Sequence, residues 1–179
     1  MRKKNYRVFV LANLIISFSA GLLGPFYIVF IERFAGMESF GAAIGIMVIA
    51  SSLTSYFAGK YSDKFGRKIF LVATSFVGSF IIFAYTLISN VFQLFILQAL
   101  SGINNSIYQT TSIAFLGDVT IKQSRGKDVG KYNAVVGVVE GIAMFLAGFL
   151  VAKIGFKVIF YVTALLSFIS SFIFLKIEE

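Results

Sequence analysis

The sequence predicts an all-α integral membrane protein with six transmembrane helices. Composition is the first reason, because 58% of the 179 residues are hydrophobic and only 13% are charged, whereas soluble domains are about 45–50% apolar and about 25% charged. The second reason is that several uncharged runs reach the length of about 20 residues that a helix needs to cross a bilayer. The third is that these runs are continuously apolar, whereas the strands of a membrane barrel alternate in polarity.

Six segments are long enough to cross the membrane. In chain order they are Val8–Ile31, Ser39–Gly59, the two parts of Ile69–Gly117 divided at Ser89-Asn90, Tyr132–Ala152 and Val158–Leu175. The first is interpreted as a retained span, because the apolar core of a signal peptide is only about 7–15 residues long. The third run is divided because it is far too long for one crossing. We therefore expect a single six-helix domain over residues 1–179.

Lysine and arginine are concentrated on one side of these spans. Of the 16 basic residues, 13 lie in the N-terminal segment, after the second and fourth spans, and at Lys176. The other three, Arg33, Lys153 and Lys157, lie on the opposite side. Because short loops rich in Lys and Arg stay in the cytoplasm, we expect both termini to be cytoplasmic.

The absence of cysteine and histidine narrows the chemistry. It removes disulfides, thiol nucleophiles, most zinc sites and the usual general base. Since no paired acids and no Ser–Lys pair stand out within a span, we expect no enzyme activity, no metal and no cofactor. The net charge of +8 does not indicate nucleic acid, because the charges lie in short loops beside apolar spans rather than on a basic face.

A charged stretch, GKYSDKFGRK, connects the second and third spans on the expected cytoplasmic side. It resembles the cytoplasmic signature of the major facilitator superfamily, roughly G-x-L-[SA]-D-[RK]-[FY]-G-R-[RK], with Tyr61 in place of the usual Leu. The matching functional positions are Gly59, Asp63, Lys64, Gly66, Arg67 and Lys68. A second stretch, GDVTIKQSRGKDVG, is similar to the family's loop after span four through Asp118, Arg125, Gly126 and Gly130.

The resemblance implies a fold of two three-helix repeats and a function in secondary-active transport of a small solute by alternating access. Family transporters usually have twelve spans in two halves, and this sequence is similar to the N-terminal half alone. Transport then needs a second half, which a homodimer, a separate chain or the remainder of a longer transporter could supply. The expected partners are a small solute, protons and the lipid bilayer, and the expected location is the plasma (inner) membrane.

Two departures from the family pattern favour another function. Proton-coupled members often carry Arg in an R-x-x-x-G pattern of span four, where this sequence has Gln98 and Gly102. Antiporters often carry G-P-x-x-G-G in span five, where Ala143–Gly148 contains no proline. The alternative is therefore a non-transporting membrane module that binds a partner or supports assembly on a degenerate transporter fold.

The resemblance also implies that the charged stretch pairs with the next cytoplasmic loop and latches one transport state. We expect Arg67 to pair with Asp118 as the first choice, and Asp63 with Arg125 as the second. Gly59 and Gly66 would allow the tight backbone of a short turn between helices. The alternative is a solvated loop whose positive charge only sets the topology.

Span four carries a stripe of polar side chains spaced three and four residues apart. Its members are Gln98, Ser101, Asn105, Tyr108 and Ser112. This spacing puts them on one helical face, and polar groups within a membrane face protein or water rather than lipid. We expect the stripe to line a substrate cavity, or else to bond neighbouring helices together.

Span five contains the one charge within any span, Glu140, near its middle. An intramembrane acid is by default a functional candidate, and an unpaired buried carboxylate tends to be protonated. Glu140 is therefore expected to bind a proton or a cationic substrate, or else to pack as a neutral, hydrogen-bonded group. A face of small residues on the same span, including Gly137 and Gly141, predicts close helix packing within the half or against a partner.

Overall fold

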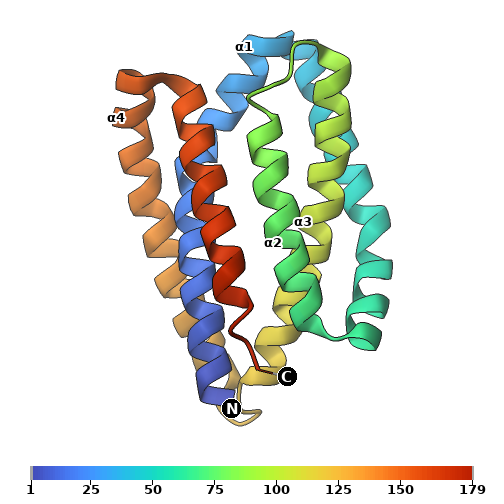
Figure 1. Ribbon diagram of the computed structural model, residues 1–179, viewed down its shortest axis with the longest axis vertical. Helices are drawn as coiled ribbons and strands as arrows, with labels where there is room; N and C mark the ends of the chain where they lie inside the picture. Colours follow the sequence, from blue (N-terminus) through green and yellow to red (C-terminus); the bar gives the residue numbers. More distant parts are fainter. Residues whose placement is uncertain (1, 179) are drawn as a thin grey trace.

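The structure is a computed structural model that describes residues 2–178. These residues form four helical elements that lie side by side in an elongated bundle, and no strand occurs among them (Figure 1). The elements are α1 (Arg2–Phe65), α2 (Arg67–Ala84), α3 (Val91–Val119) and α4 (Arg125–Phe174). The prediction of an all-α fold is confirmed.

The connection between α2 and α3 lies where the sequence predicts it. α2 ends at Ala84, and Asn90 precedes the first residue of α3. The Asn90 side chain accepts a hydrogen bond from the backbone N–H of Gln93 at 3.0 Å, which satisfies a donor that the start of a helix would otherwise leave free. A polar Ser-Asn pair therefore divides one long apolar run into two helices.

α1 and α4 each double back on themselves at the end away from Arg2 and Glu178 (Figure 1). Within α1 the torsions are non-helical at Gly24 and Gly36, and within α4 they are non-helical at Gly155. Gly36 (φ 76°, ψ 166°) and Gly155 (φ 77°, ψ 170°) have nearly the same conformation, in a region of positive φ that glycine adopts readily. The six separate helices expected from the sequence are thus four elements here, because single glycines replace two of the expected loops.

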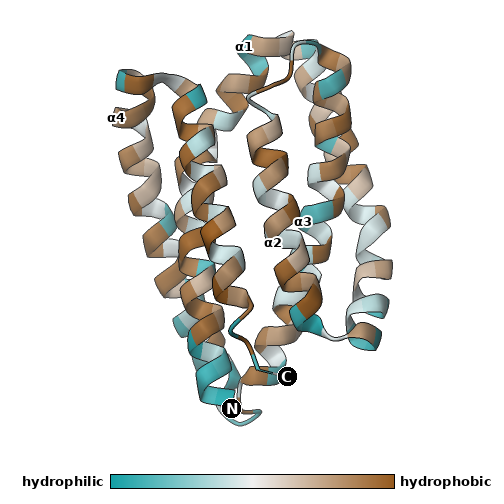
Figure 2. Ribbon diagram, in the orientation of Figure 1, coloured by the Kyte–Doolittle hydropathy of each residue, from teal (hydrophilic) through white to brown (hydrophobic). Residues whose placement is uncertain are grey.

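Four stretches of helix are long and apolar enough to cross a membrane by length and composition. They are Arg2–Gly24, Phe26–Phe65, Arg67–Ala84 and Arg125–Phe174. α3 is not among them, since its polar side chains lower its hydropathy. Hydrophobic residues dominate the length of the bundle, and hydrophilic residues gather most strongly near Arg2 and Glu178 (Figure 2).

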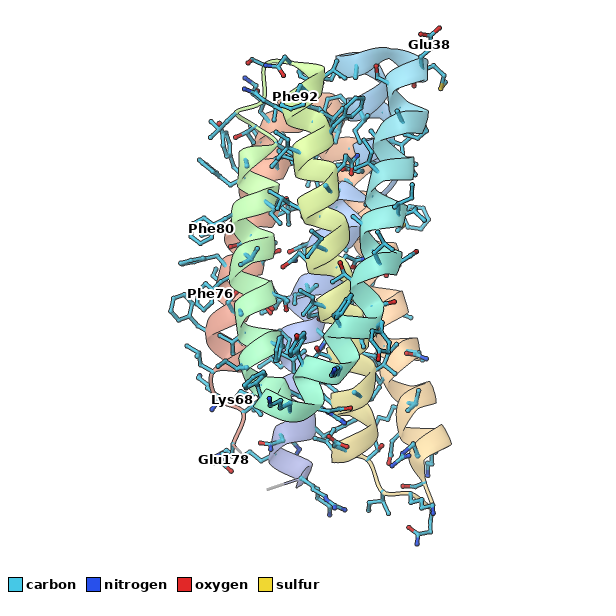
Figure 3. The ribbon with its side chains drawn as sticks, turned by 90° about the vertical axis from the view of Figure 1, so that its right-hand side faces the viewer. Glu38, Lys68, Phe76, Phe80, Phe92 and Glu178 are labelled. Carbon is cyan, nitrogen blue, oxygen red and sulfur yellow. The ribbon has the colours of Figure 1, made fainter. Side chains whose placement is uncertain are left out.

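Much of the apolar surface points outward. Phe80 and Phe92 are 62% and 72% exposed, and the side chains of Phe76 and Phe80 project away from the bundle (Figure 3). A soluble monomer rarely exposes large contiguous apolar patches. The outward phenylalanines therefore fit a surface that lies against lipid.

Glycine brings the backbone of α1 into contact with two other helices. A Cβ atom placed on Gly102 of α3 would lie only 2.2 Å from the backbone oxygen of Met47 in α1. A Cβ atom placed on Gly21 of α1 would lie 2.4 Å from the backbone oxygen of Glu140 in α4. Small residues allow such close approach in membrane bundles, so the first stretch of α1 is held against α4 and the stretch after Gly36 is held against α3.

The two ends of the described chain are held together. The Asn5 amide nitrogen donates to the Glu178 carbonyl at 2.7 Å, and the Glu178 backbone N–H donates to the Asn5 side-chain oxygen at 3.0 Å. Lys4 also forms an ion pair with Glu178, and the hydrogen bond and charge of Lys4 lower the pKa of the Glu178 carboxyl. The first and last described segments therefore lie at the same end of the bundle (Figure 1).

We expect Gly102→Ala to destabilise the bundle by about 1–3 kcal/mol, the usual cost of overpacking, because the added Cβ would collide with the α1 backbone. Thermal unfolding of the purified protein in detergent measures this as a lower midpoint. Gly117→Ala in the same helix is the matched control, since a Cβ there would meet no atom within 4 Å. Equal midpoints for the two variants would contradict the helix contact.

Candidate functional site

A cavity of about 420 Å³ opens among all four elements, with walls from α1, α2, α3 and the second part of α4. Its polar lining residues are Tyr27, Tyr85, Ser101, Asn104 and Asn105. A second pocket, of about 240 Å³, shares five of the same lining residues, including Asn104 and Asn105, and adds Thr74, Tyr108 and Gln109 among others. We treat the two as one continuous site, called here the central cavity. Its lining contains no charged side chain among the described residues.

One wall of the central cavity is a pair of tyrosines. The Tyr27 and Tyr85 hydroxyls are 2.8 Å apart, and their rings meet edge to face with centroids 5.4 Å apart. The Tyr27 hydroxyl lies 3.0 Å from the Gln98 side-chain oxygen, and the Tyr85 hydroxyl lies 3.0 Å from the Ser101 hydroxyl. The network joins α1, α3 and the end of α2, and so fixes how both rings face the cavity.

Gln98 lies behind this pair rather than in the cavity. Its side chain is completely buried, and its amide nitrogen has no hydrogen-bond partner among the described residues. A buried amide donor without a partner is costly. The position that the sequence marks as a departure from the family pattern is therefore a support for the tyrosines, with one donor left over.

The predicted polar stripe of span four is divided by the structure. Ser101, Asn105 and Tyr108 line the central cavity, whereas Gln98 supports its wall. Ser112 is buried, and its hydroxyl has no partner among residues 2–178. The stripe is therefore partly cavity lining and partly helix interior.

Several polar cavity residues were missed by sequence reasoning, including Thr74, Ser75, Gln109 and Ser167 of the second pocket; Asn104, Tyr27 and Tyr85 show why. Asn104 adjoins Asn105 but falls outside the spacing of the stripe, so only its polarity within a span could have revealed it. Tyr27 follows the kink at Gly24 by three residues, so helical spacing does not reveal it. Tyr85 comes just after the end of α2, where an aromatic residue is ordinary at a membrane interface, so no signal separates it.

Asn13 forms a second polar junction, between α1, α3 and α4. Its side-chain oxygen accepts hydrogen bonds from the Tyr108 hydroxyl at 2.6 Å and the Tyr132 hydroxyl at 2.9 Å. Its amide nitrogen donates to the Phe9 carbonyl at 2.9 Å. Because Tyr108 also lines the cavity, this junction fixes one side of the site.

Glu140 is half-buried on α4 and does not line the central cavity. No described residue forms a hydrogen bond or ion pair with its carboxylate. Met144, one turn further along the same face, lies beside Gly24, where an added Cβ would be 3.5 Å from the methionine side chain. Gly24 lines the cavity, whereas Glu140 itself contacts α1 through its backbone carbonyl at Gly21. Among residues 2–178, no three acidic side chains gather closely enough to hold a metal ion.

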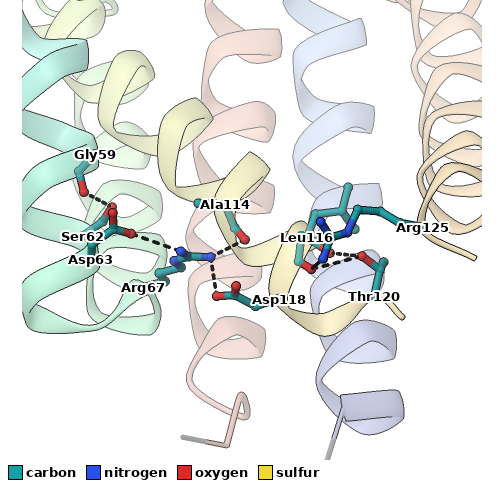
Figure 4. A network of polar contacts seen from close by, with 10 residues as sticks. Gly59, Ser62, Asp63, Arg67, Ala114, Leu116, Asp118, Thr120 and Arg125 are labelled. Carbon is teal, nitrogen blue, oxygen red and sulfur yellow. Dashed lines mark hydrogen bonds and ion pairs between the residues drawn. The ribbon is translucent and has the colours of Figure 1, made fainter. Parts of the chain in front are cut away.

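Arg67 joins three helix ends at the end of the bundle that holds Arg2 and Glu178 (Figure 4). It is the first residue of α2, and its guanidinium donates to Asp63 in the last turn of α1 at 3.1 Å. It also donates to the Ala114 carbonyl and to the Asp118 carboxylate of α3, with which it forms an ion pair. Arg67 and Asp118, the first-choice pair from the sequence, are thus in contact; a latching role stays a prediction.

The second-choice pair, Asp63 with Arg125, is absent from this structure. Asp63 pairs with Arg67 instead, and the Arg125 guanidinium donates to the Gly117 carbonyl at 2.8 Å. The physical reason is that carbonyls near the end of a helix lack helical partners, and Arg125, at the start of α4, lies next to the end of α3.

The charged stretch is also less of a loop than expected. Gly66, with a φ of 91°, is the turn between α1 and α2. Gly59 lies inside α1, so its expected role in the turn is wrong. Lys64 is exposed, with its ammonium 5.2 Å from the centre of the Phe65 ring, and Lys68 lies within the first turn of α2.

The sequence model of the major facilitator superfamily matches residues 9–179 of the chain. The chain belongs to this superfamily. The facilitator-type chain is 27% identical to the MFS-type transporter YitZ of Bacillus subtilis, over 89% of this chain and 98% of the relative. It is 31% identical to the MFS-type transporter YuxJ of Bacillus subtilis, over 89% of this chain and 42% of the relative. It is also 31% identical to Multidrug resistance protein 1 of Bacillus subtilis, over 84% of this chain and 39% of the relative.

The facilitator domain described here therefore spans almost all of one relative and less than half of the other two. Family membership and the long apolar helices make the chain part of an integral, multi-pass membrane protein. The expectations of a facilitator family, a transporter and a membrane location are confirmed at this level.

We expect a cysteine at Asn105 to react quickly with a small water-soluble thiol reagent and a cysteine at Gln98 to react slowly, because Asn105 is exposed in the cavity and Gln98 is buried. The chain has no cysteine of its own, so each variant carries a single reactive thiol. Labelling rates in detergent, measured by mass, compare two positions on one helix. Equal rates would argue against the cavity wall described here.

Proposed function

We propose that the chain forms one half of a secondary-active transporter in the plasma (inner) membrane, which moves a small organic solute by alternating access. The observation that carries the proposal is the central cavity, whose larger part is a hollow of about 420 Å³ with five polar residues in a mostly apolar lining, inside the helical domain of a transporter family. Substrate sites near the bilayer midplane, at the interface between structural repeats, are typical of secondary transporters.

The proposed topology has six crossings in two three-helix repeats, with both termini cytoplasmic. α1 and α2 would form one repeat, and α3 and α4 the other. Two facts support it: α1 and α4 double back at Gly36 and Gly155, and the Asn5–Glu178 contact brings both ends of the chain together. The basic residues concentrated near that end are the pattern of a cytoplasmic side.

The proposed second half would pack on faces of α1 and α4 that have small residues and no neighbour. A Cβ added to Gly41 or Gly45 of α1, or to Gly137 or Gly141 of α4, would meet no described atom within 4 Å. Each pair is a G-x-x-x-G spacing, which permits close helix approach. The packing expected for the span-five face is thus not made within this half, which supports a partner: a second copy in a homodimer or another six-helix half.

The proposed substrate class is an aromatic organic cation exchanged for protons. Three relatives carry the words "multidrug resistance" in their names. In this chain the cavity is lined by Tyr27, Tyr85 and Phe160, and aromatic faces attract cations. Glu140, one turn before Met144 on α4, is the proposed proton or cation site.

The alternative is a non-transporting membrane module that binds a partner. One observation favours it: the cavity lining has no charged side chain among the described residues. A module of this kind would need the small-residue faces of α1 and α4 but not the cavity or Glu140, so variants of Glu140 separate the two functions.

We expect Glu140→Gln to reduce the response of transport to a pH gradient by at least about tenfold, because Gln keeps the shape of Glu but cannot release a proton. The assay is movement of ethidium, an aromatic cation, into proteoliposomes with and without an imposed pH gradient. Movement of the dye down its own gradient should persist. A Gln variant that still concentrates ethidium would show that Glu140 does not couple the proton.

Glu38→Gln is the matched control, since Glu38 is exposed at the far end of the bundle (Figure 3) and undergoes the same chemical change.

Lowering the ratio of chain to lipid in the same assay tests whether transport needs a second half. Activity per molecule should fall on dilution if two copies assemble, and an undiminished activity of single copies would contradict the need for a second half. No activity in any wild-type preparation of this chain alone would favour another six-helix half or the non-transporting module.

We expect Arg67→Ala and Asp118→Ala each to change the rate of ethidium transport, and Asp118→Ala to add little once Arg67 is gone, because the two side chains form an ion pair. An exposed pair is worth up to about 1 kcal/mol, which is about a fivefold change in rate. Arg67→Ala should have the larger effect, since Arg67 also binds Asp63 and the Ala114 carbonyl. Lys60→Ala controls for loss of a positive charge at the same end. Fully additive effects would mean that the two residues act separately.

A further inference from the structure

A third hollow, of about 580 Å³, lies where the start of α1, the end of α3 and the start of α4 meet. We call it the basic pocket. Its basic lining residues are Arg2, Lys3, Arg7 and Lys131. It shares no lining residue with the central cavity or with the pocket around Arg67, so neither site accounts for it.

The basic pocket has more positive charge than its own acids can neutralise. Its one acidic lining residue is Asp128, whose carboxylate already accepts a hydrogen bond from the Ser124 hydroxyl at 2.9 Å. None of the four basic side chains forms an ion pair with a described residue, whereas Lys4 and Arg67 at the same end do. Four cations therefore face one hollow with a single carboxylate between them.

Internal hydrogen bonds hold the other walls of the pocket. The Tyr6 hydroxyl donates to the Asp128 carbonyl at 3.2 Å, and the Thr120 hydroxyl donates to the Leu116 carbonyl at 2.8 Å. Ser124 precedes the first turn of α4, where the helix dipole adds positive potential. The hydroxyl groups are thus used within the fold, and the basic groups remain for a ligand that carries negative charge.

The helices that supply the basic side chains continue with exposed apolar residues. Leu11, one turn beyond Arg7 on α1, is 53% exposed. Val135 and Val138, one and two turns beyond Lys131 on α4, are 39% and 63% exposed. A ligand with an anionic head and apolar chains would meet positive charge first and apolar surface next, in the order that a lipid leaflet presents them.

We propose that the basic pocket binds the phosphate headgroup of an anionic phospholipid, with its acyl chains along the Leu11 and Val135 faces. A soluble phosphate shares the charge but would gain nothing from the apolar residues. The proposal requires only that the chain lies in a membrane, and it does not depend on the proposed transport. Bound lipid would bridge α1 and α4 at the end where their charged residues otherwise repel one another.

The test uses the purified full chain in detergent and three probes: a short-chain phosphatidylglycerol, the matching phosphatidylcholine and inorganic phosphate. Native mass spectrometry counts bound lipid, and thermal unfolding gives the stabilisation. We expect phosphatidylglycerol to bind at one molecule per chain and raise the unfolding midpoint, with little effect from the other two. The double substitution Arg7→Gln with Lys131→Gln should weaken the binding of phosphatidylglycerol by about 30-fold, since each basic group near a lipid surface contributes roughly fivefold to binding.

Lys60→Gln with Lys64→Gln is the matched control, because both lysines are exposed, lie at the same end and fall outside the pocket. Should the pocket variant fail to fold, added salt on the wild type takes its place, since screening weakens a charged headgroup contact. Equal binding to both double variants, or binding that salt leaves unchanged, would overturn the site. Saturation by inorganic phosphate at the same concentration as phosphatidylglycerol would overturn the lipid assignment.

Discussion

Two close contacts between helix backbones, at Gly21 of α1 and Gly102 of α3, are the constraint on which the rest of this bundle depends. Because Gly21 of α1 has no side chain, its backbone lies against the carbonyl oxygen of Glu140 in α4. Gly102 of α3 lies in the same way against the carbonyl oxygen of Met47 in α1. Lipid offers no hydrophobic drive for helices to associate, so close packing and interhelical hydrogen bonds must supply it. The contacts set the spacing of the helices, and that spacing decides which polar side chains reach one another. The Tyr27–Gln98 and Asn13–Tyr108 bonds join the first stretch of α1 to α3, alongside the Gly21 contact of that stretch with α4.

The hydrogen bonding of the polar interior also follows from the surrounding lipid. In hydrocarbon an unsatisfied polar group is costly, so most interior hydroxyls donate to a carbonyl one turn away, as Thr74 and Thr163 do. The groups that depart from this rule are informative. Four side chains have a buried atom without a partner in the described chain: Gln98, Thr111 and Ser112 of α3, and Ser19 of α1. The helix with three of the four, α3, also supplies half of the polar residues that line the central cavity. A helix that lines a hollow has polar groups that local bonds do not satisfy, which is also why α3 is less apolar than its neighbours.

Sequence reasoning predicted the helical class, the break at Ser89-Asn90 and the Arg67–Asp118 contact, because these depend on local polarity and on a motif whose position repeats across a family. It did not predict that Gly36 and Gly155 would turn the chain alone, since a glycine between charged residues fits a longer loop equally well. It gave Asp63 the wrong partner, because the spacing of charges along a chain does not determine which helix end lies nearest. Tyr85 was missed for a similar reason: its role depends on the approach of α1, which only the assembled bundle provides.

The ion pairs of Arg67 with Asp63 and Asp118 are weak, and their weakness indicates what they can do. The two carboxylate partners are 65% and 60% exposed, and exposed ion pairs contribute only about 0–1 kcal/mol each. A junction of that strength cannot lock a bundle, but about 1 kcal/mol changes the ratio of two conformations about fivefold. The proposed alternation between two states would need contacts that bias each state and still break on every cycle. The ion pairs of Arg67 with Asp63 at the end of α1 and with Asp118 at the end of α3 have that modest strength. The buried Gly21 and Gly102 contacts, by comparison, would be costly to break. Any change of shape should therefore keep the Gly21 and Gly102 contacts and break the exposed ion pairs of Arg67 first.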